Sequence, residues 1–446
     1  MPSGYIRVTR DQPDVRTPPA TAPEVLRAPG RPSRRTTGGR YPGPTLTANE
    51  PFPTPTVVDS ATALSDTVRQ WQPETERGRR IPKPLVEQLR EAGLYRMLLP
   101  RVLGGLETDL PTCFRAVEVM AEADASVGWN LLNNSVIQMS SLAFPDEGVE
   151  ELYAAGADQI VAGTLVPGGG RGRRVEGGYV VTGRWRFGSG CREARWMIGN
   201  FDLDDETAAA SEGEPPPGVY RVAFRAEECT VIDTWDMTGM RGTGSHDWTV
   251  TDVFVPDRRV LYVPGRVLLN QWQRWPGTLY ALPVHTITGP HHSMIATGVA
   301  RAGIDALAEL AGSKVPRGRD GGLLRDKPQI QDWVGRAEAH LQGGRAYRDQ
   351  VVREVWHTLE SGGSVSLDQC ARSRLAGSFA ADSARQAMDL VCRAAGTTAT
   401  QRTHRLAHCW RDLQVVGQAG AVTPDWYPIA GRALLGLDPG SRLTTC

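Results

Sequence analysis

The spacing of apolar residues changes twice along the chain, and this succession is the strongest limit on its fold. Apolar residues recur at helical spacing over 57–157, alternate with polar ones over the glycine-rich stretch 158–264, and return to helical spacing over 265–446. Short loops divide the last region into four long helical segments. The pattern predicts a mainly helical α+β protein with an N-terminal helical domain, a central antiparallel β domain and a C-terminal four-helix bundle.

Residues 1–56 lie outside this pattern. They hold 12 of the 32 prolines and eight arginines, with few apolar residues and no sustained period. A segment of this kind cannot bury enough apolar surface to offset the entropy of ordering it. We expect a disordered or extended tail, and no specific signal supports the alternative of a docking arm.

The composition argues against several classes of function. Lys and Arg number 50 together, as do Asp and Glu, so net charge does not draw the chain to nucleic acid or to an anionic membrane. The sequence has neither a run of about 18 apolar residues nor an apolar N-terminal signal segment. Its seven cysteines are scattered and never form C-x-x-C. We therefore expect a cytoplasmic protein with reduced thiols and no disulfide framework.

Glycine-rich and histidine-containing segments lack the spacings of nucleotide and metal sites. PGGGRGRR (167–174) and GMRGTGSHD (239–247) complete neither the Rossmann motif G-x-G-x-x-G nor the P-loop motif. His404 and His408 are four residues apart, but Arg405 stands where the motif H-E-x-x-H needs a glutamate. We expect two surface histidines there and no metal. The nucleophile motif G-x-S-x-G of serine hydrolases is also missing.

Segments spread over most of the chain resemble the acyl-CoA dehydrogenase superfamily. The opening helices of that family resemble LREAGLYRMLLPRVLGGLETDL and AEADASVGWNLL, and its flavin strand resembles GGYVVTGRWRFGSGCREARW. The strands that close its β domain resemble WDMTGMRGTGSHDWTVTDVFVPDRRV. Its C-terminal bundle resembles RDKPQIQDWVGRAEAHL and AAGTTATQRTHRLAHCWRDL. The sequence of these segments, above all Ala125–Trp129 and Phe187–Gly190, is most similar to the flavin-dependent monooxygenase branch of the superfamily. The resemblance implies a β-barrel for the central domain and a homotetramer or homodimer.

The resemblance also implies a reduced flavin, FADH2 or FMNH2, bound at the central domain. Phe187 would form an aromatic wall, Gly188 would let the backbone approach, and Ser189 would place a hydroxyl beside flavin N5. The alternative interpretation of these three residues is an ordinary edge strand with a glycine bulge. The implied flavin contacts, some near a neighbouring subunit's bundle, are Trp129, Thr164, Phe187, Gly188, Ser189, Arg241, Arg325, Gln329, Gly396 and Thr397.

The sequence departs from the dehydrogenases of this family where they carry their catalytic base. Acyl-CoA dehydrogenases remove an α-proton with a glutamate on the last helix or on the first bundle helix. Neither 413–422 nor 285–300 contains a carboxylate. Without a base, α,β-desaturation lacks its first step, so the sequence favours oxygen chemistry.

A second departure concerns the substrate side. Aromatic hydroxylases of the branch carry histidines on a central helix and on the last helix, where this chain has Gln138 and Gln418. An amide can hydrogen-bond but cannot accept a phenol proton, which favours N-oxygenation or hydroxylation of an already acidic ring. We expect Ser189, Gln418, His291 and His292 to be catalytic and Asn133, Asn134 and Gln138 to bind substrate; Trp129 would also shape this side.

These inferences predict a two-component flavin-dependent monooxygenase. A separate flavin reductase would supply reduced flavin, whose C4a-hydroperoxide, formed with O2, would oxygenate a nucleophilic carbon or nitrogen of a small molecule such as a natural-product intermediate. An acyl-CoA dehydrogenase-type desaturase with an unrecognised base is one alternative. The other is a member without flavin that acts as a lyase, cyclase or scaffold.

Overall fold

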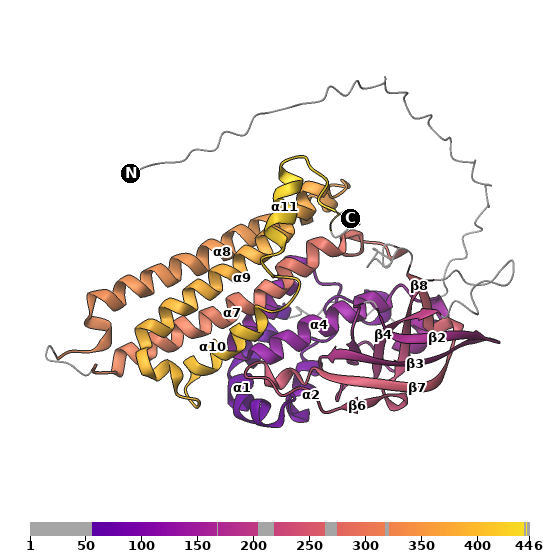
Figure 1. Ribbon diagram of the computed structural model, residues 1–446, viewed down its shortest axis with the longest axis horizontal. Coiled ribbons are helices and arrows are strands. Elements are labelled where there is room, and N and C mark those ends of the chain that lie inside the picture. Colours follow the sequence, from indigo (N-terminus) through magenta and orange to yellow (C-terminus); the bar gives the residue numbers. More distant parts are fainter. Residues whose placement is uncertain are drawn as a thin grey trace, which may run out of the picture. The chain divides into compact units, whose positions relative to one another are not determined.

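The computed structural model describes residues 56–166, 168–203, 218–263, 274–316, 321–440 and 443, all within the unit that begins at Pro51. The predicted tail therefore lies outside the described residues, apart from Thr56. Figure 1 shows a helical region beside a β-sheet, with α4 running along their junction.

Capping side chains mark the start of several N-terminal helices. Thr56 and Asp59 form a reciprocal cap at the start of the first helix. Asp109 accepts a hydrogen bond from Thr112 N at 2.9 Å at the start of the third. The helices are α1 (Val57–Gly78), α2 (Lys83–Glu91), α3 (Leu110–Ala123), α4 (Ala125–Ser141) and α5 (Asp146–Tyr153).

Asp124 both ends α3 and begins α4. Its carboxylate accepts hydrogen bonds from Ser126 N at 2.8 Å and Val127 N at 3.1 Å, and its backbone is extended. The chain therefore turns between two helices with no loop between them. Burial raises the pKa of Asp124 to about 6. Nearly all side chains of α4 are buried, as expected for a helix covered on both sides.

The central domain is one mixed sheet and not the expected antiparallel barrel. The strands are β1 (Val161–Gly163), β2 (Gly169–Val175), β3 (Gly178–Gly188), β4 (Trp196–Leu203), β5 (Val219–Arg225), β6 (Thr230–Ile232), β7 (His246–Pro256) and β8 (Val260–Val263). Among the described residues they pair in the order β6-β7-β3-β2-β4-β5-β8, with β1 beside β4. Both β1 and β2 run parallel to β4. The path stays open because its terminal strands, β6 and β8, are only three and four residues long.

Aromatic stacking fixes the end of β3. The Trp185 ring stacks on Trp248 of β7 with ring centroids 4.3 Å apart. A Cβ on Gly199 would lie 2.8 Å from Trp185 Cε2, so glycine is needed there for the ring to lie flat on the sheet. Beyond Trp185 the pairing of β3 with β7 shifts register before Gly188. This irregularity changes the direction of the backbone just before Ser189.

The described residues of the C-terminal region form three long α-helices and two short ones. They are α7 (Val284–Ser313), α8 (Pro328–Glu360), α9 (Leu367–Ala395), α10 (Arg405–Val416) and α11 (Trp426–Leu434). The helix α9 packs against both α7 and α8, while α10 packs against α7. A bundle of four long helices is not confirmed, because the fourth segment forms only the 12-residue helix α10. None of the described helices is both long and apolar enough to cross a membrane.

One of the described cysteines does not follow the sequence expectation. Cys113, Cys191, Cys229, Cys392 and Cys409 are free thiols. Cys370 on α9 is disulfide-bonded, so the expectation that every cysteine is reduced is wrong at this position. Cys370 lies in a small apolar cluster in which Trp426 and Leu443 pack against α9.

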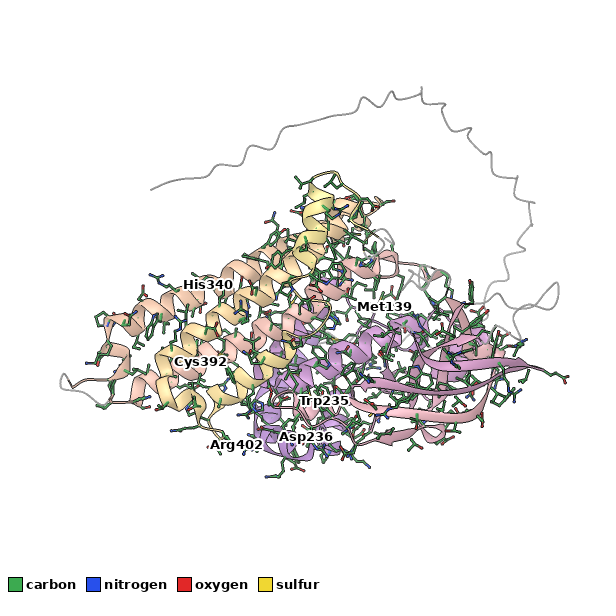
Figure 2. The ribbon with its side chains drawn as sticks, in the orientation of Figure 1. Met139, Trp235, Asp236, His340, Cys392 and Arg402 are labelled. Carbon is green, nitrogen blue, oxygen red and sulfur yellow. The ribbon has the colours of Figure 1, made fainter. Side chains whose placement is uncertain are left out.

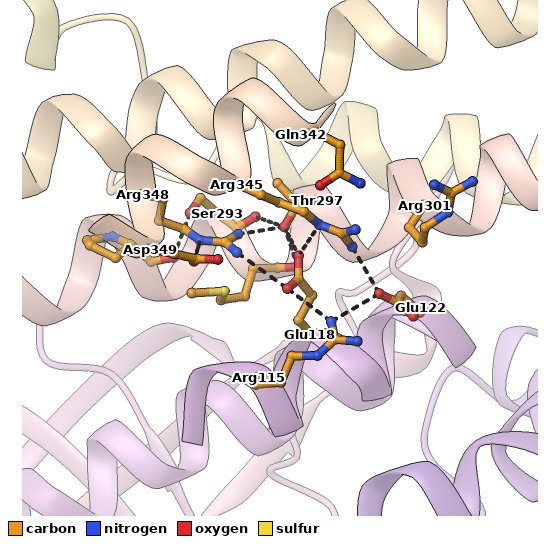
Figure 3. A network of polar contacts seen from close by, with 12 residues as sticks. Arg115, Glu118, Glu122, Ser293, Thr297, Arg301, Gln342, Arg345, Arg348 and Asp349 are labelled. Atoms are coloured by element: carbon orange, nitrogen blue, oxygen red, sulfur yellow. Dashed lines mark hydrogen bonds and ion pairs between the residues drawn. The ribbon is translucent and has the colours of Figure 1, made fainter. Parts of the chain in front are cut away.

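A buried ion network joins α3 to α7 and α8. Glu118 on α3 pairs with Arg345 at 3.0 Å and with Arg348 at 3.3 Å, and Arg348 donates to Thr297 at 2.7 Å (Figure 3). Burial alone would raise the pKa of Glu118, but Arg348 and Arg345 outweigh it and lower that pKa to about 2. Arg345 also pairs with Glu122 at 2.9 Å. The network fixes the N-terminal helices against the C-terminal ones.

Glu118→Gln should destabilise the protein by about 3 kcal/mol, because it removes the buried carboxylate that Arg345 and Arg348 share and leaves the buried Arg348 with only the partly exposed Asp349. Asp332→Asn, which breaks the exposed pair with Arg336, is the matched control and should cost less than about 1 kcal/mol. Chemical denaturation at pH 7 measures both. Because the folded pKa of Glu118 is lowered, the difference should persist above pH 4.5 and shrink as the pH falls toward 2. Equal losses in the two variants would contradict this account.

Candidate functional site

Ser189 lies where the end of β3, the helix α4 and the segment before β7 meet. Its hydroxyl accepts a hydrogen bond from Trp129 Nε1 at 3.1 Å, and Asn134 Nδ2 donates to its carbonyl at 3.1 Å. The residue is 6% exposed. The sequence expectation placed Trp129, Asn134 and Ser189 in one site, and the structure brings these three residues into direct contact.

A chain of hydroxyl groups continues from Ser189 into the protein. The Ser189 hydroxyl lies 2.8 Å from that of Ser245, which lies 2.7 Å from that of Thr243. Thr243 donates to the Met240 carbonyl at 2.9 Å. Thr243 belongs to the 3-10 turn η3 (Arg241–Thr243), whose Thr243 carbonyl also accepts from Gly190 N at 2.9 Å. The turn therefore holds the Ser189–Gly190 segment through both backbone and side chain.

Phe187 combines an unusual backbone with an exposed ring. Its φ is 63°, a region that residues other than glycine rarely adopt, and its side chain is 58% exposed. The ring meets Trp235 edge-on with centroids 6.3 Å apart. Figure 2 places Trp235 at the side of the sheet that faces the helices. Gly188 follows, and a Cβ there would lie 2.9 Å from Trp248 Cδ1. The segment thus presents a flat aromatic surface beside the Ser189 hydroxyl.

The helix α4 divides the predicted polar residues between two faces. Trp129 and Asn133 lie on the partly exposed face, where Asn133 Nδ2 donates to the Trp129 carbonyl at 3.0 Å. Asn130, Asn134 and Gln138 are spaced by four residues on the buried face. Gln138 is fully buried and donates to the Gln159 carbonyl at 2.6 Å. Asn133 therefore lies on the face that is open to a substrate, and Gln138 lies on the covered face.

The two adjacent histidines of α7 have different surroundings. His291 is fully buried against Phe114, and neither ring nitrogen has a partner among the described residues. His292 is partly exposed, meets Trp129 edge-on at 5.2 Å and forms a hydrogen bond between Nδ1 and the Thr288 carbonyl at 2.7 Å. Burial lowers the pKa of His292 to about 4 and that of His291 well below its usual range. Both rings are therefore neutral at pH 7, and His292 is the one next to the site.

An ion cluster supports the turn η3 from behind. Asp412 of α10 accepts from Met240 N at 2.6 Å and pairs with His408 Nε2 at 3.1 Å, while His408 Nδ1 lies 3.1 Å from Glu76. The expectation of a surface histidine at 408 is not met, because its side chain is only 12% exposed and lies between Glu76 of α1 and Asp412 of its own helix α10. Burial alone would lower the pKa of His408, but Asp412 and Glu76 raise it well above its usual value. No group of side chains suited to bind a metal exists among the described residues.

Arg241 and Thr164 lie on segments that border the site. The Arg241 guanidinium pairs with Asp236 at 2.7 Å and donates to the Glu76 carbonyl at 3.3 Å. Thr164 follows β1, donates its N–H to the Ile198 carbonyl at 2.8 Å, and is only partly buried. A phosphate contact at Arg241 would compete with Asp236. Both flavin assignments stay predictions.

Five other residues that were predicted to contact flavin or substrate lie away from Ser189 within one subunit. Arg325, Gln329, Gly396 and Thr397 lie where α8 begins and α9 ends, at the end of the helical region far from the sheet (Figure 1). Gln418 is exposed just beyond α10. Within the described residues, none of the five forms a hydrogen bond with the cluster around Ser189. Their assignment to a flavin or substrate stays a prediction.

A cavity of about 200 Å³ lies on the other side of His291. Its lining residues are Pro111, Phe114, Arg115, Glu118, Met294, Arg348, Asp349, Val352 and Arg353. Phe114 separates it from His291, and Arg348 there is already occupied by Glu118 and Thr297. The cavity therefore belongs to the buried ion network and not to the Ser189 cluster.

Comparison with known proteins identifies the family. The chain matches the N-terminal domain of acyl-CoA dehydrogenase over residues 59–154 and the C-terminal domain over 291–423. It is 30% identical over 379 residues to a flavin-dependent monooxygenase, oxygenase subunit HsaA, of Rhodococcus jostii, covering 84% of this chain and 97% of that protein. The chain belongs to the acyl-CoA dehydrogenase superfamily, in its flavin-dependent monooxygenase branch.

Two further proteins are similar to this chain over most of its length. It is 27% identical over 402 residues to the oxygenase component of an FADH2-dependent resorcinol hydroxylase of Rhizobium sp., covering 86% of this chain and 95% of the relative. The crystal structure of the 3-HSA hydroxylase from Rhodococcus sp. RHA1 superposes with a TM-score of 0.77 at 27% identity, covering 86% of this chain and 97% of that one.

The residues around Ser189 fit the flavin that this branch of the superfamily implies. Asn130 Oδ1 and Asn134 Oδ1 are buried and have no partner among the described residues. Both amides border Gly190, where a Cβ would lie 3.2 Å from Asn134 Oδ1. Unpaired buried acceptors are rare and call for a donor, and a reduced flavin ring carries several N–H groups. The exposed Phe187 ring adds an apolar wall for a flat ligand.

Sequence reasoning missed the residues behind Ser189. Ser245 and Thr243 lie in the segment GMRGTGSHD, of which only Arg241 was singled out, and Asp412 lies in the segment CWRDL. A signal existed in the small hydroxyl residues grouped among glycines. Their contact with Ser189, however, spans 56 positions of sequence and depends on the pairing of β3 with β7.

His291→Phe should make the protein less sensitive to acid. The folded state keeps His291 neutral, whereas the unfolded chain binds a proton below about pH 6.5, so stability is lost as the pH falls. Between pH 7.5 and 5.5, His291 should lower the free energy of unfolding of the wild type by at most about 1.4 kcal/mol. The variant should not show this loss. Phenylalanine has a similar volume and needs no hydrogen-bond partner. Denaturation at the two pH values measures the difference.

The control for this experiment is His357→Phe at an exposed position of α8, which should follow the wild type. His408, whose folded pKa is raised, adds stability as the pH falls, but it does so equally in all three proteins. An acid loss in His291→Phe as large as that of the wild type would show that His291 is not held neutral.

Proposed function

We propose that this chain is the oxygenase component of a two-component flavin-dependent monooxygenase. It would transfer one oxygen atom of O2 to a nucleophilic carbon or nitrogen of a small molecule. The observation that carries the proposal is the hydrogen-bonded Ser189 next to the exposed ring of Phe187, in a chain whose relatives are named as flavin-dependent oxygenases. O2 would be the co-substrate.

The reduced flavin would supply the electrons that activate O2, and the protein would hold and shield it. Phe187 would lie against the ring, and Ser189 would hold the proton at N5. Asn130 and Asn134 would accept further ring N–H groups through their unpaired oxygens. Burial of this junction matters, because access of water promotes loss of the activated oxygen as hydrogen peroxide.

The substrate would lie against the open face of α4 and the neighbouring turn of α7. Trp129 and Asn133 contribute a wall and an amide, and the neutral ring of His292 lies within contact of Trp129. Because Nδ1 of His292 bonds to the Thr288 carbonyl, Nδ1 carries the proton and Nε2 is left as an acceptor. That nitrogen could accept a hydrogen bond from a phenol O–H or an amine N–H, but the lowered pKa makes it a poor base.

Dehydrogenation of a thioester is disfavoured because the described residues around this junction offer no suitable base. The described residues of 285–300 and 413–422 include no carboxylate that could remove an α-proton. Glu118, on the neighbouring helix α3, is ion-paired and its pKa is lowered to about 2. It is therefore a poor base. No specific observation favours the alternative of a lyase, cyclase or scaffold.

The proposal implies two kinds of protein partner. The sequence has no nicotinamide-binding motif, so electrons would arrive through reduced flavin from a separate reductase. Arg325, Gln329, Gly396 and Thr397 lie far from Ser189 in one subunit, and we propose that they contact the flavin of a neighbouring subunit in a homotetramer or homodimer.

The purified chain alone should not oxidise NADH or NADPH at a useful rate. With a generic flavin reductase and FAD or FMN added, it should consume O2 and oxygenate phenolic, indolic or amine test compounds. NADH loss, O2 uptake and product mass measure this. Efficient NADH oxidation without a reductase would contradict the two-component proposal.

Ser189→Ala should uncouple the reaction without abolishing flavin binding. Removing a buried hydrogen bond costs about 1–3 kcal/mol, or roughly ten- to a hundredfold in a rate constant. More hydrogen peroxide and less oxygenated product should therefore appear for each O2 consumed. Ser378→Ala is the control, because this buried serine on α9 donates to the Thr423 carbonyl and, within the part of the chain that the structure describes, has no contact with the cluster around Ser189. An unchanged ratio of peroxide to product in Ser189→Ala would remove Ser189 from the mechanism.

A further inference from the structure

The hydroxyl chain behind Ser189 has only one consistent direction. It contains three oxygen–oxygen contacts: Ser189 to Ser245 at 2.8 Å, Ser245 to Thr243 at 2.7 Å, and Thr243 to the Met240 carbonyl at 2.9 Å. Three hydroxyl hydrogens are present for these three contacts. The carbonyl at the end has no hydrogen to give.

Each hydroxyl must therefore donate toward Met240. Thr243 donates to the carbonyl, which leaves Ser245 to donate to Thr243 and Ser189 to donate to Ser245. Reversing any contact would leave two oxygens within 2.9 Å of each other with no hydrogen between them, which is repulsive. Trp129 Nε1 can only donate, so it fits the same direction at the other end of the chain.

The Met240 end of the chain is firmly held. Met240 has a φ of 52°, and its N–H donates to Asp412 at 2.6 Å. Its carbonyl also accepts from Trp235 Nε1 at 2.9 Å. Asp412 in turn pairs with the partly buried His408. Because both sides of this peptide are fixed, the acceptor that sets the direction of the hydroxyl chain cannot turn away.

This direction leaves Ser189 as an acceptor. A serine oxygen has one hydrogen and two lone pairs. The hydrogen goes to Ser245 and one lone pair to Trp129, so the second lone pair is the group that Ser189 can offer to a ligand. Ser189 thus suits a ligand N–H and does not suit an unprotonated ring nitrogen.

We infer that Ser245 and Thr243 are positioning residues that make the site selective for reduced flavin over oxidised flavin. Reduced flavin carries a hydrogen on N5, whereas N5 of oxidised flavin is an acceptor and would face a lone pair of Ser189. The inference rests on the proposed function, in which flavin N5 lies beside Ser189. It goes further by assigning the choice of redox state to two residues that do not touch the flavin.

Equilibrium binding of the two redox states tests this inference directly. FAD and FMN are each titrated as oxidised flavin and, anaerobically, as dithionite-reduced flavin, and the ratio of the two Kd values is taken. Thr243→Val and Ser245→Ala both release Ser189 from its fixed direction, so its hydrogen can turn toward N5. Oxidised flavin should then bind more tightly, and the preference for reduced flavin should fall roughly two- to tenfold.

Conservative variants separate this effect from a general loss of structure. Thr243→Ser keeps the hydroxyl and should keep the wild-type ratio, as should the control Ser378→Ala. In a Ser189→Ala background, Ser245→Ala should change the ratio no further, because Ser245 acts through Ser189. The comparison of Thr243→Val with Thr243→Ser stands alone if Ser245→Ala does not fold.

The outcomes distinguish the inference from the proposed function. If the wild type binds flavin but Thr243→Val and Thr243→Ser show the same ratio, the inference is wrong and the monooxygenase proposal is untouched. If the wild type does not bind FAD or FMN, oxidised or reduced, the proposed function fails and this inference fails with it.

Discussion

The buried carboxylate of Asp124 is the constraint on which the geometry of this protein depends. It caps α4 while ending α3, so two helices meet at one residue with no loop to absorb a change in their angle. The helix α3 then carries Glu118 to the arginines of α8, and α4 carries Trp129 to Ser189. The junction with the C-terminal helices and the junction with the sheet are thereby set by the same turn.

Local patterns predicted the elements better than the way they assemble. The helices with strong caps, such as the one that begins at Thr56, and the strand that carries Phe187 were predicted from spacing and motif. The barrel and the bundle of four long helices were not found, because closure of a sheet depends on edge strands such as β6, whose three residues leave no periodic signal. The enclosed His408 and the disulfide-bonded Cys370 were missed because their partners are distant in sequence.

The candidate site was predictable to the extent that it follows one strand and one helix. Ser189, Trp129 and Asn134 were expected in one site and lie in contact, since FGSG stands at the end of β3 and SVGWNLLNN lies within α4; their roles stay predictions. The helical period could not say which face of α4 meets the sheet, so Asn133 and Gln138 were assigned to one side although the structure separates them. The contacts expected near a neighbouring bundle, such as Arg325 and Thr397, are far from Ser189 within one subunit, and a single sequence carries no signal for contacts between subunits.

The backbone of Phe187 has a consequence for the energetics of binding. A residue with a side chain held at φ 63° carries a conformational cost of about 1–2 kcal/mol. The folded protein bears this cost through the stacking of Trp185 on Trp248 and the contacts of Ser189, before any ligand is present. The conformational entropy of this backbone is therefore lost during folding and not during binding. A flat ring that docks on Phe187 does not lose affinity by ordering it. Global stability is exchanged at this position for a prearranged binding face.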